Sequence, residues 1–365
     1  MTPQQLVGAA VLVLWSFTAC AAGQWQGQSY PAARAAERAT DVPVWETFDT
    51  GGSGAPDDRR DFLTDIAFSD DRHGWTCGYG GVFATHDGGA TWRRQWRALR
   101  PPESWCHLEL DAAGRPWVLV RLHGRADARL LRGDGMGEWT SVAAPLTGAQ
   151  DFLVRDGQMW VLGGMQGGLY SDDGGARWQE IDFGGELSGA FRLTRLTDGV
   201  NGGAVYVLGM DNGRPVLVYS PDGRSGWERI ALPQGLPTAM HAYSLHFATT
   251  QRGVVGLPDG GVAVTSDGGK TWRQQNLRSG HHVTALFMLP DGRIHAAVRN
   301  DDVDFPGPAI FYSPNLGRTW LQAVAGRMQV NVFIRNGGLL WGAGSVPGRV
   351  ANDLLLSYRI PVATP

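Results

Sequence analysis

Charge of either sign is scarce in this sequence, and the motifs of common cofactors are missing. Asp, Glu, Lys and Arg make up 18% of the 365 residues, below the ~25% usual for globular proteins, and the formal net charge is −3. This balance favours neither nucleic acid nor an anionic membrane surface as a partner. The sequence contains no nucleotide-binding loop, zinc box or Gly-x-Ser-x-Gly elbow, so we expect no cofactor and no bound metal.

Long apolar runs are also scarce, and the run at the N-terminus is too short to span a bilayer. Residues 6–17 are almost continuously apolar and small residues follow, which predicts a signal peptide over residues 1–22. Phe17-Thr18-Ala19-Cys20 resembles the lipobox of bacterial lipoproteins, in which the Cys is acylated. The alternative is cleavage just after Cys20, which would release a soluble protein. Both alternatives predict export to the periplasm, and acylation with Ala21 next in the chain predicts an outer-membrane anchor.

Cysteine is almost absent from the remainder of the chain. Only Cys77 and Cys106 follow Cys20, and they form an even pair in an oxidising compartment. They are either joined as a disulfide or remain two buried thiols that act as small apolar residues.

Glycine, by contrast, is abundant, and one glycine-rich phrase recurs. The 52 Gly are about twice the average usage, as expected for many short strands joined by tight turns. The phrase reads TSDGGKTW at 265–272, THDGGATW at 85–92 and SDDGGARW at 171–178, with looser copies at 132–139, 220–227 and 313–320. Each copy has an acid or its amide five residues before a Trp: Asp87 and Trp92, Asp134 and Trp139, Asp173 and Trp178, Asp222 and Trp227, Asp267 and Trp272, Asn315 and Trp320.

The phrase predicts the tip of a β-hairpin. A short Asp side chain accepts hydrogen bonds from backbone N–H groups just ahead of it, which is an Asx-type turn. The glycines then supply the positive φ that a tight reversal needs. The closing Trp begins the returning strand and covers the turn with its ring. We therefore interpret these acids as structural.

The phrase is the Asp-box, or BNR, pattern, and the chain resembles proteins that carry it. Asp boxes occur in sialidases, some glucan-degrading enzymes, sortilin-like receptors and photosystem II assembly-factor-like propellers, and the resemblance implies a β-propeller. The match is closest to the photosystem II assembly-factor-like family, best from Phe68 through Gly74-Trp75, Gly78 and Gly81 to Thr85–Trp92. That family implies a scaffold that binds protein partners, whereas the sialidases are more distant.

The spacing of the motif Trp residues predicts the number of blades. Successive intervals are 47, 39, 49, 45 and 48 residues, close to the 40 to 50 of a four-stranded propeller blade. After Trp320 only three strand-like runs remain, whereas residues 42–49 form a lone strand near the N-terminus. Pairing this strand with residues 353–360 would complete the last blade and remove an exposed edge. We predict an all-β, seven-bladed propeller of four-stranded antiparallel blades over residues 42–361, preceded by a flexible tether over 23–41.

Alternating strand direction places all Asp-box tips on one face and predicts a binding face on the other. There, loops between second and third strands and between blades gather basic and polar side chains that suit an acidic peptide or carboxylate. For each residue alone, an ordinary solvated loop is the alternative. The candidates are Arg59, Arg60, Arg121, His123, Arg125, Arg214, His241, His281, Arg299, Asp301, Asp302 and Arg327.

One phrase of the sialidases is present but misplaced. Tyr358-Arg359-Ile360-Pro361 spells it, yet it lies in the last predicted strand, whereas in those enzymes it precedes the first Asp box. No Glu follows Glu228, so the last blades cannot supply the glutamate that the enzymes need. The Asp-box acids lie on separate blade tips and cannot act as an acid–base pair. We predict no catalytic residues.

Two functions follow from these observations. The leading hypothesis is an exported, non-enzymatic, monomeric propeller that binds protein partners and helps to assemble or stabilise an envelope membrane complex. Its membrane contact would be limited to the lipid anchor. The alternative is a glycan-active propeller, either a sialidase-like glycoside hydrolase or a lectin.

Overall fold

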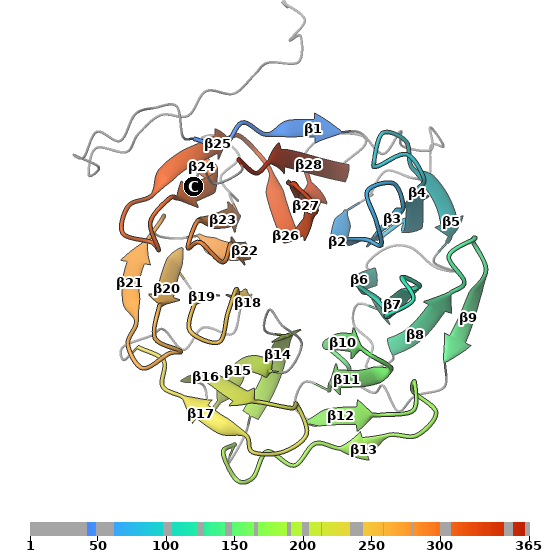
Figure 1. Cartoon of the computed structure of the whole chain (residues 1–365), viewed down its shortest axis with the longest axis horizontal. Coiled ribbons are helices and arrows are strands. Elements are labelled where there is room, and N and C mark those ends of the chain that lie inside the picture. The colour runs from blue at the N-terminus through green and yellow to red at the C-terminus, as the bar shows by residue number, and fades with distance from the viewer. Residues whose placement is uncertain are drawn as a thin grey trace, which may run out of the picture.

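Seven four-stranded antiparallel sheets surround a central axis, as Figure 1 shows. The structure is a computed structural model. It describes residues 42–48, 62–97, 104–122, 128–142, 148–163, 167–187, 191–198, 204–212, 214–233, 244–257, 259–278, 281–299, 308–346 and 353–361. The predicted signal peptide, its Cys20 and the predicted tether lie outside these residues. Within them, no helix has the length and apolar character that crossing a membrane requires.

The first three blades run from the innermost strand outward in chain order. Blade 1 contains β2 (Leu63–Phe68), β3 (Gly74–Gly78), β4 (Gly81–Thr85) and β5 (Arg93–Trp96). Blade 2 contains β6 (Ser104–Leu110), β7 (Pro116–Leu122), β8 (Ala128–Gly133) and β9 (Trp139–Val142). Blade 3 contains β10 (Asp151–Arg155), β11 (Gln158–Leu162), β12 (Gly168–Ser171) and β13 (Gln179–Glu180).

The next three blades repeat this order. Blade 4 contains β14 (Phe191–Asp198), β15 (Val205–Asp211), β16 (Arg214–Ser220) and β17 (Glu228–Ile230). Blade 5 contains β18 (Leu245–Phe247), β19 (Gly253–Gly256), β20 (Gly261–Thr265) and β21 (Arg273–Asn276). Blade 6 contains β22 (His282–Met288), β23 (Ile294–Arg299), β24 (Pro308–Ser313) and β25 (Leu321–Ala325).

Blade 7 departs from the order because the N-terminal strand completes it. Its inner strands are β26 (Gln329–Asn336), β27 (Leu339–Ser345) and β28 (Asp353–Arg359), and β1 (Glu46–Phe48) pairs antiparallel with β28. Trp45, just before β1, is buried and contacts the rings of Phe333 and Tyr358 at 5.5 and 5.7 Å between centroids. The predicted closure of the ring by the N-terminal strand is confirmed.

The burial of each strand follows its position in the blade. Every residue of β3, β4 and β20 is buried, because both faces of a middle strand pack against neighbouring blades. The outer strands β5 and β21 are short and mainly polar, and none of their residues is buried. In this chain a run of consecutive buried residues therefore marks a middle strand. A strand with one face in solvent would instead alternate buried and exposed residues.

Polar side chains on the innermost strands connect successive blades. Thr64, Thr284 and Asn331 each occupy a register shift in the inner strand, where a β-bulge turns the side chain sideways. Each donates a hydrogen bond to a carbonyl of the next blade: Thr64 to Cys106 at 2.7 Å, Thr284 to Val330 at 2.5 Å and Asn331 to Leu63 at 2.6 Å. The last of these bonds joins blade 7 to blade 1 across the seam.

Candidate binding face and central cavity

The Asp-box side chains are used within their own turns. Asp87 accepts hydrogen bonds from the Thr91 N–H at 2.8 Å and the Thr91 hydroxyl at 2.6 Å, and from the Thr85 hydroxyl at 2.8 Å. Asp267 repeats this arrangement with Thr271. These hydrogen bonds lower the pKa of Asp87 and of Asp267 to about 2.

The other four copies keep the turn with simpler partners. The carboxylate of Asp173 accepts the N–H of Arg177, and Asp134 and Asp222 accept N–H groups from their own turns. In blade 6 the amide oxygen of Asn315 takes the same role, accepting the N–H of Thr319 at 2.9 Å. All six motif residues act as turn acceptors, as expected from the phrase.

Hydrogen bonds place the Asp boxes at one end of the blades. The N–H of Gly88, in the first box, donates to the carbonyl of Arg72 in the β2–β3 turn at 2.9 Å. In blade 6 Leu316 of the box donates to Gly292 of the β22–β23 turn. Because the strands are antiparallel, the connections between second and third strands and between blades lie at the other end. We call that end the connection face.

Several candidates from the sequence lie on the connection face. Arg121 near the end of β7 is half-buried, whereas Arg214 at the start of β16 and Arg299 at the end of β23 are exposed. They belong to blades 2, 4 and 6, so they share a face but not a blade. His281 is half-buried before β22, and Arg327 is exposed before β26. Arg59, Arg60, His123, Arg125, His241, Asp301 and Asp302 lie outside the described residues.

Arg359, from the sialidase-like phrase, lies elsewhere. It is the last residue of β28 and pairs with Leu339 beside the β26–β27 turn, which places it at the Asp-box end and away from the axis. This position agrees with the expectation that Arg359 does not serve as a sialidase arginine.

The two late cysteines are joined. A disulfide links Cys77 of β3 to Cys106 of β6, so it crosses from blade 1 to blade 2, and both residues are buried. The hydroxyl of Thr64 lies 2.9 Å from the sulfur of Cys106. Of the two alternatives left by the sequence, the disulfide is the one present.

Three aromatic side chains of blades 1 and 2 form a cluster that is not among the residues predicted from the sequence. Phe62 stacks on Tyr79 at 5.1 Å between centroids and meets the edge of Trp105 at 5.5 Å. All three are half-buried, and Trp105 lies opposite Arg121 in the β6–β7 pairing. We call these four residues the aromatic–arginine cluster. No local pattern marks it, because its members lie at the ends of four strands, β2, β3, β6 and β7, that the pairing and packing of blades 1 and 2 bring together.

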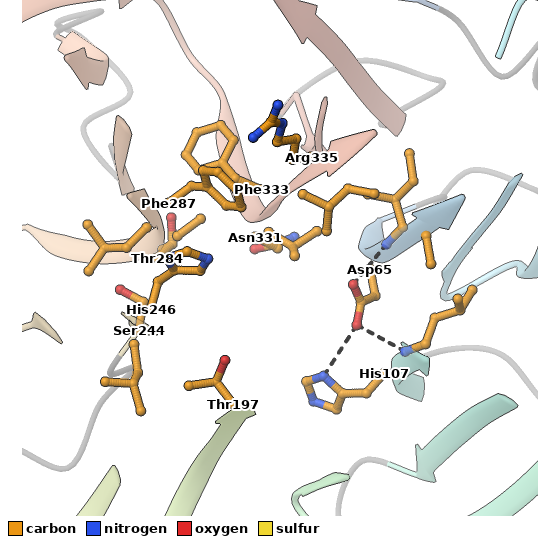
Figure 2. A pocket seen from close by; sticks show the side chains of 18 of the residues that line it. Asp65, His107, Thr197, Ser244, His246, Thr284, Phe287, Asn331, Phe333 and Arg335 are labelled. Carbon is orange, nitrogen blue, oxygen red and sulfur yellow. Dashed lines mark hydrogen bonds and ion pairs between the residues drawn. The ribbon is translucent and has the colours of Figure 1, made fainter. Parts of the chain in front are cut away.

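A cavity of about 500 Å³ lies along the central axis. Its lining comes from the innermost strand of each blade and extends from Ser244 and Thr284 toward Pro290 and Arg335, beside turns at the Asp-box end. Figure 2 shows the side chains that face it. A volume of this size is typical of small-molecule sites.

One wall of the cavity carries ionisable side chains from three blades, among them Asp65, His107 and Asp151. The ring of His107 has its Nδ1 at 3.7 Å from Asp65 and 3.5 Å from Asp151. Asp65 also accepts the N–H groups of Ile66 at 2.8 Å and Leu108 at 2.9 Å. Among the described residues, no group of three or more His, Cys, Asp or Glu is arranged to hold a metal ion. In the sequence, this wall is signalled by an ionisable side chain among the apolar residues of each of β2, β6 and β10.

The opposite wall is aromatic. Phe287 and Phe333 lie there, with the ring of His246 packed on Phe287 at 4.3 Å between centroids (Figure 2). His246 Nδ1 accepts the N–H of Met288 at 3.2 Å, and burial lowers the pKa of His246 to about 4. His246 is therefore uncharged at neutral pH.

Comparison with known proteins identifies the fold. No protein-family model and no curated protein matches the chain. YCF48 from Cyanidioschyzon merolae superposes with a TM-score of 0.62 at 17% identity, covering 86% of this chain and 98% of that one. YCF48 bound to D1 peptide gives 0.62 at 17% identity, covering 87% and 95%. A GH74 xyloglucanase from Xanthomonas campestris gives 0.58 at 15% identity, covering 85% of this chain and 55% of the enzyme. At these identities the likeness shows the propeller fold alone.

Proposed function

We propose that this protein is an exported, non-enzymatic binding propeller that engages a protein partner through its connection face. The partner belongs to an envelope membrane complex, whose assembly or stability the monomeric propeller supports. An acylated Cys20 would hold the propeller at the outer membrane from its periplasmic side. The observation that carries the proposal is the aromatic–arginine cluster.

The composition of this cluster is that of a protein-binding hot spot. Tyr, Trp and Arg dominate the binding energy of protein interfaces, because they combine a large apolar area with a polar end. Phe62, Tyr79 and Trp105 hold one another in place, so little side-chain entropy is lost on binding. Arg121 adds a charge beside them, and Arg214 and Arg299 lie on the same face. An acidic peptide segment with an apolar side chain complements this surface.

Structural neighbours are compatible with this role. One of them, YCF48, was solved with a D1 peptide, so a propeller of this shape binds peptide. In contrast, the carboxylates of the Asp-box turns are occupied by their own N–H groups, which leaves them unsuited to general acid–base work.

Charge reversal on the two faces tests the proposal. Arg121→Glu should weaken capture of the partner from envelope membranes at least roughly tenfold, because it places a like charge against an acidic segment. Lys270→Glu, an exposed substitution in an Asp box, provides the matched control and should leave capture unchanged. Equal capture by both variants, with thermal melts like that of the unsubstituted protein, would reject the connection face.

The glycan-active alternative has one observation in its favour. Asp65 and Asp151 both lie near the Nδ1 of His107, so two carboxylates share one wall of the cavity, and a glycosidase needs two carboxylates. Both, however, are tied to backbone N–H groups inside the channel. Release of reducing sugar from sialoside or xyloglucan, lost on Asp65→Asn, would replace the scaffold proposal with this alternative.

A further inference from the structure

The outer strand of blade 7 is attached differently from the outer strands of blades 1 to 6. In those blades the outer strand follows the third strand through an Asp-box turn. β1 instead comes from the other end of the chain and lies on β28 through three residue pairs, from Glu46–Ser357 to Phe48–Leu355. β1 can therefore leave β28 without opening a hairpin.

Aromatic side chains attach this short strand to the ring. Phe48 packs on Trp341 at 5.2 Å between ring centroids. Trp45 is 5% exposed, and besides its contacts in blade 7 it meets the ring of His295 in blade 6 edge-on at 5.7 Å. Trp45 therefore joins the N-terminal strand to the interface between blades 6 and 7.

This interface buries polar atoms that have no partner. His295 is 0% exposed, and its Nδ1 and Nε2 and the Nε1 of Trp45 lack a hydrogen-bond partner in the described part of the chain. Buried polar atoms are almost always hydrogen-bonded, and an unpaired one is costly. Water that enters when Trp45 leaves can pair with all three atoms. The closed arrangement therefore relies on ring packing, against a polar cost that opening removes.

The rings packed against His295 carry no formal charge in acid, where a phenol stays protonated. On β22 the residue that pairs with His295 is Phe287, which is also uncharged. The rings around the imidazole are Trp45 before β1, Tyr312 of β24, Phe333 of β26 and Tyr358 of β28.

Two charged groups act on His295 and oppose each other. Arg293 disfavours its protonation and Asp291 favours it, and the two are paired at 2.7 Å. Burial, followed by the charge of Arg293, lowers the pKa of His295 to about 3. Once Trp45 leaves and water reaches the imidazole, its pKa returns toward the ordinary 6.5. Acid therefore favours the open arrangement over the closed one.

We propose that Trp45 and β1 form an acid-released latch on blade 7. When His295 takes up a proton, Trp45 and β1 detach, and the edge of β28 loses its partner strand. A free strand edge pairs readily with another strand, so the released form presents a surface that the closed ring conceals. The latch lies on blade 7, whereas the aromatic–arginine cluster lies on blades 1 and 2, so the two proposals stand or fall independently.

Hydrogen exchange followed by mass spectrometry compares two outer strands of the unsubstituted protein. Peptides that cover β1 and β5 are measured at pH 7, 5.5 and 4.5 and corrected for the intrinsic pH dependence of exchange. We expect the protection of β1 to fall about tenfold between pH 5.5 and 4.5, while β5 keeps its protection. Equal losses in both strands would indicate general unfolding, and constant protection of β1 would indicate a strand that acid does not release. Either result would overturn the proposal.

Variants then assign the effect to His295. His295→Leu should remove the pH dependence of β1 protection, because the side chain takes up no proton. His246→Gln is the matched control, since burial also lowers the pKa of His246, and it should leave that dependence unchanged.

Trp45→Leu provides a second readout if His295→Leu does not fold. It should lower the protection of β1 already at pH 7 and flatten its pH dependence, because water then reaches His295 in the resting protein. A folded His295→Leu variant with the full pH dependence, or a Trp45→Leu variant that protects β1 like the unsubstituted protein, would contradict the latch.

Discussion

At the scale of single residues, His295 is the least expected side chain in the core. It lies in β23 with 0% exposure, and the rings of Trp45, Tyr312 and Tyr358 contact it at 5.7, 5.1 and 5.4 Å. Neither ring nitrogen has a hydrogen-bond partner in the described part of the chain. Burial and then the charge of Arg293 lower its pKa to about 3.

This environment predicts a loss of stability in acid. The folded state holds His295 neutral, whereas the unfolded state protonates near the ordinary pKa of 6.5. The free energy of unfolding should therefore fall by about 1.4 kcal/mol per pH unit as the pH drops from 6.5 toward 3. The aromatic rings attract an imidazolium, but its lost hydration outweighs that attraction in a site without polar partners.

Denaturant titrations at several pH values check this prediction. His246, whose pKa is about 4, contributes a second similar slope, so His295→Leu should roughly halve the pH sensitivity between pH 6 and 4.5. His86→Gln, on the surface, should leave the slope as it is. A His295→Leu variant with the full slope would show that protonation of His295 does not limit acid stability.

At the scale of elements, the Asp-box turn is the repeated unit. Its acceptor oxygen, not its charge, orders the backbone, because Asn315 accepts the N–H of Thr319 just as Asp267 accepts that of Thr271. The blade 6 turn therefore shows that an amide oxygen can take the place of the carboxylate oxygen in this turn.

Substitution of Asp267 separates charge from hydrogen bonding. Asp267→Ala removes the acceptor for the N–H and hydroxyl of Thr271 and should lower Tm by roughly 2 to 4 °C. Asp267→Asn keeps an acceptor oxygen and should lie much closer to the unsubstituted protein. Differential scanning calorimetry decides between them, and equal losses in both variants would mean that the charge itself stabilises the turn.

These elements were predictable because their determinants are local. An Asp, two glycines and a Trp within eight residues specify a turn, and their spacing counts the blades. Even β1 followed from counting strands. The cavity and the aromatic–arginine cluster were not predictable, because Asp65, His107 and Asp151 are separate polar residues in three inner strands that meet only when the ring closes.

At the scale of the whole molecule, the ring holds the Asp-box turns at one end and the connection face at the other. The seam is closed by β1, by Trp45 and by the hydrogen bond from Asn331 to Leu63, and the Asp boxes order one face. The aromatic–arginine cluster lies on the other face, and the cavity occupies the axis. The ring thus keeps the connection face and the axial cavity apart from the Asp-box turns.

The central claim is that the partner binds the connection face and not the Asp-box face. A photo-crosslinking amino acid at position 79, beside Trp105, or at position 266, in the Asp box of blade 5, measures this directly in intact cells. We predict one discrete crosslinked product from position 79 and none from position 266, with both variants folded. A product from position 266 alone would contradict the account and place the partner on the Asp-box face.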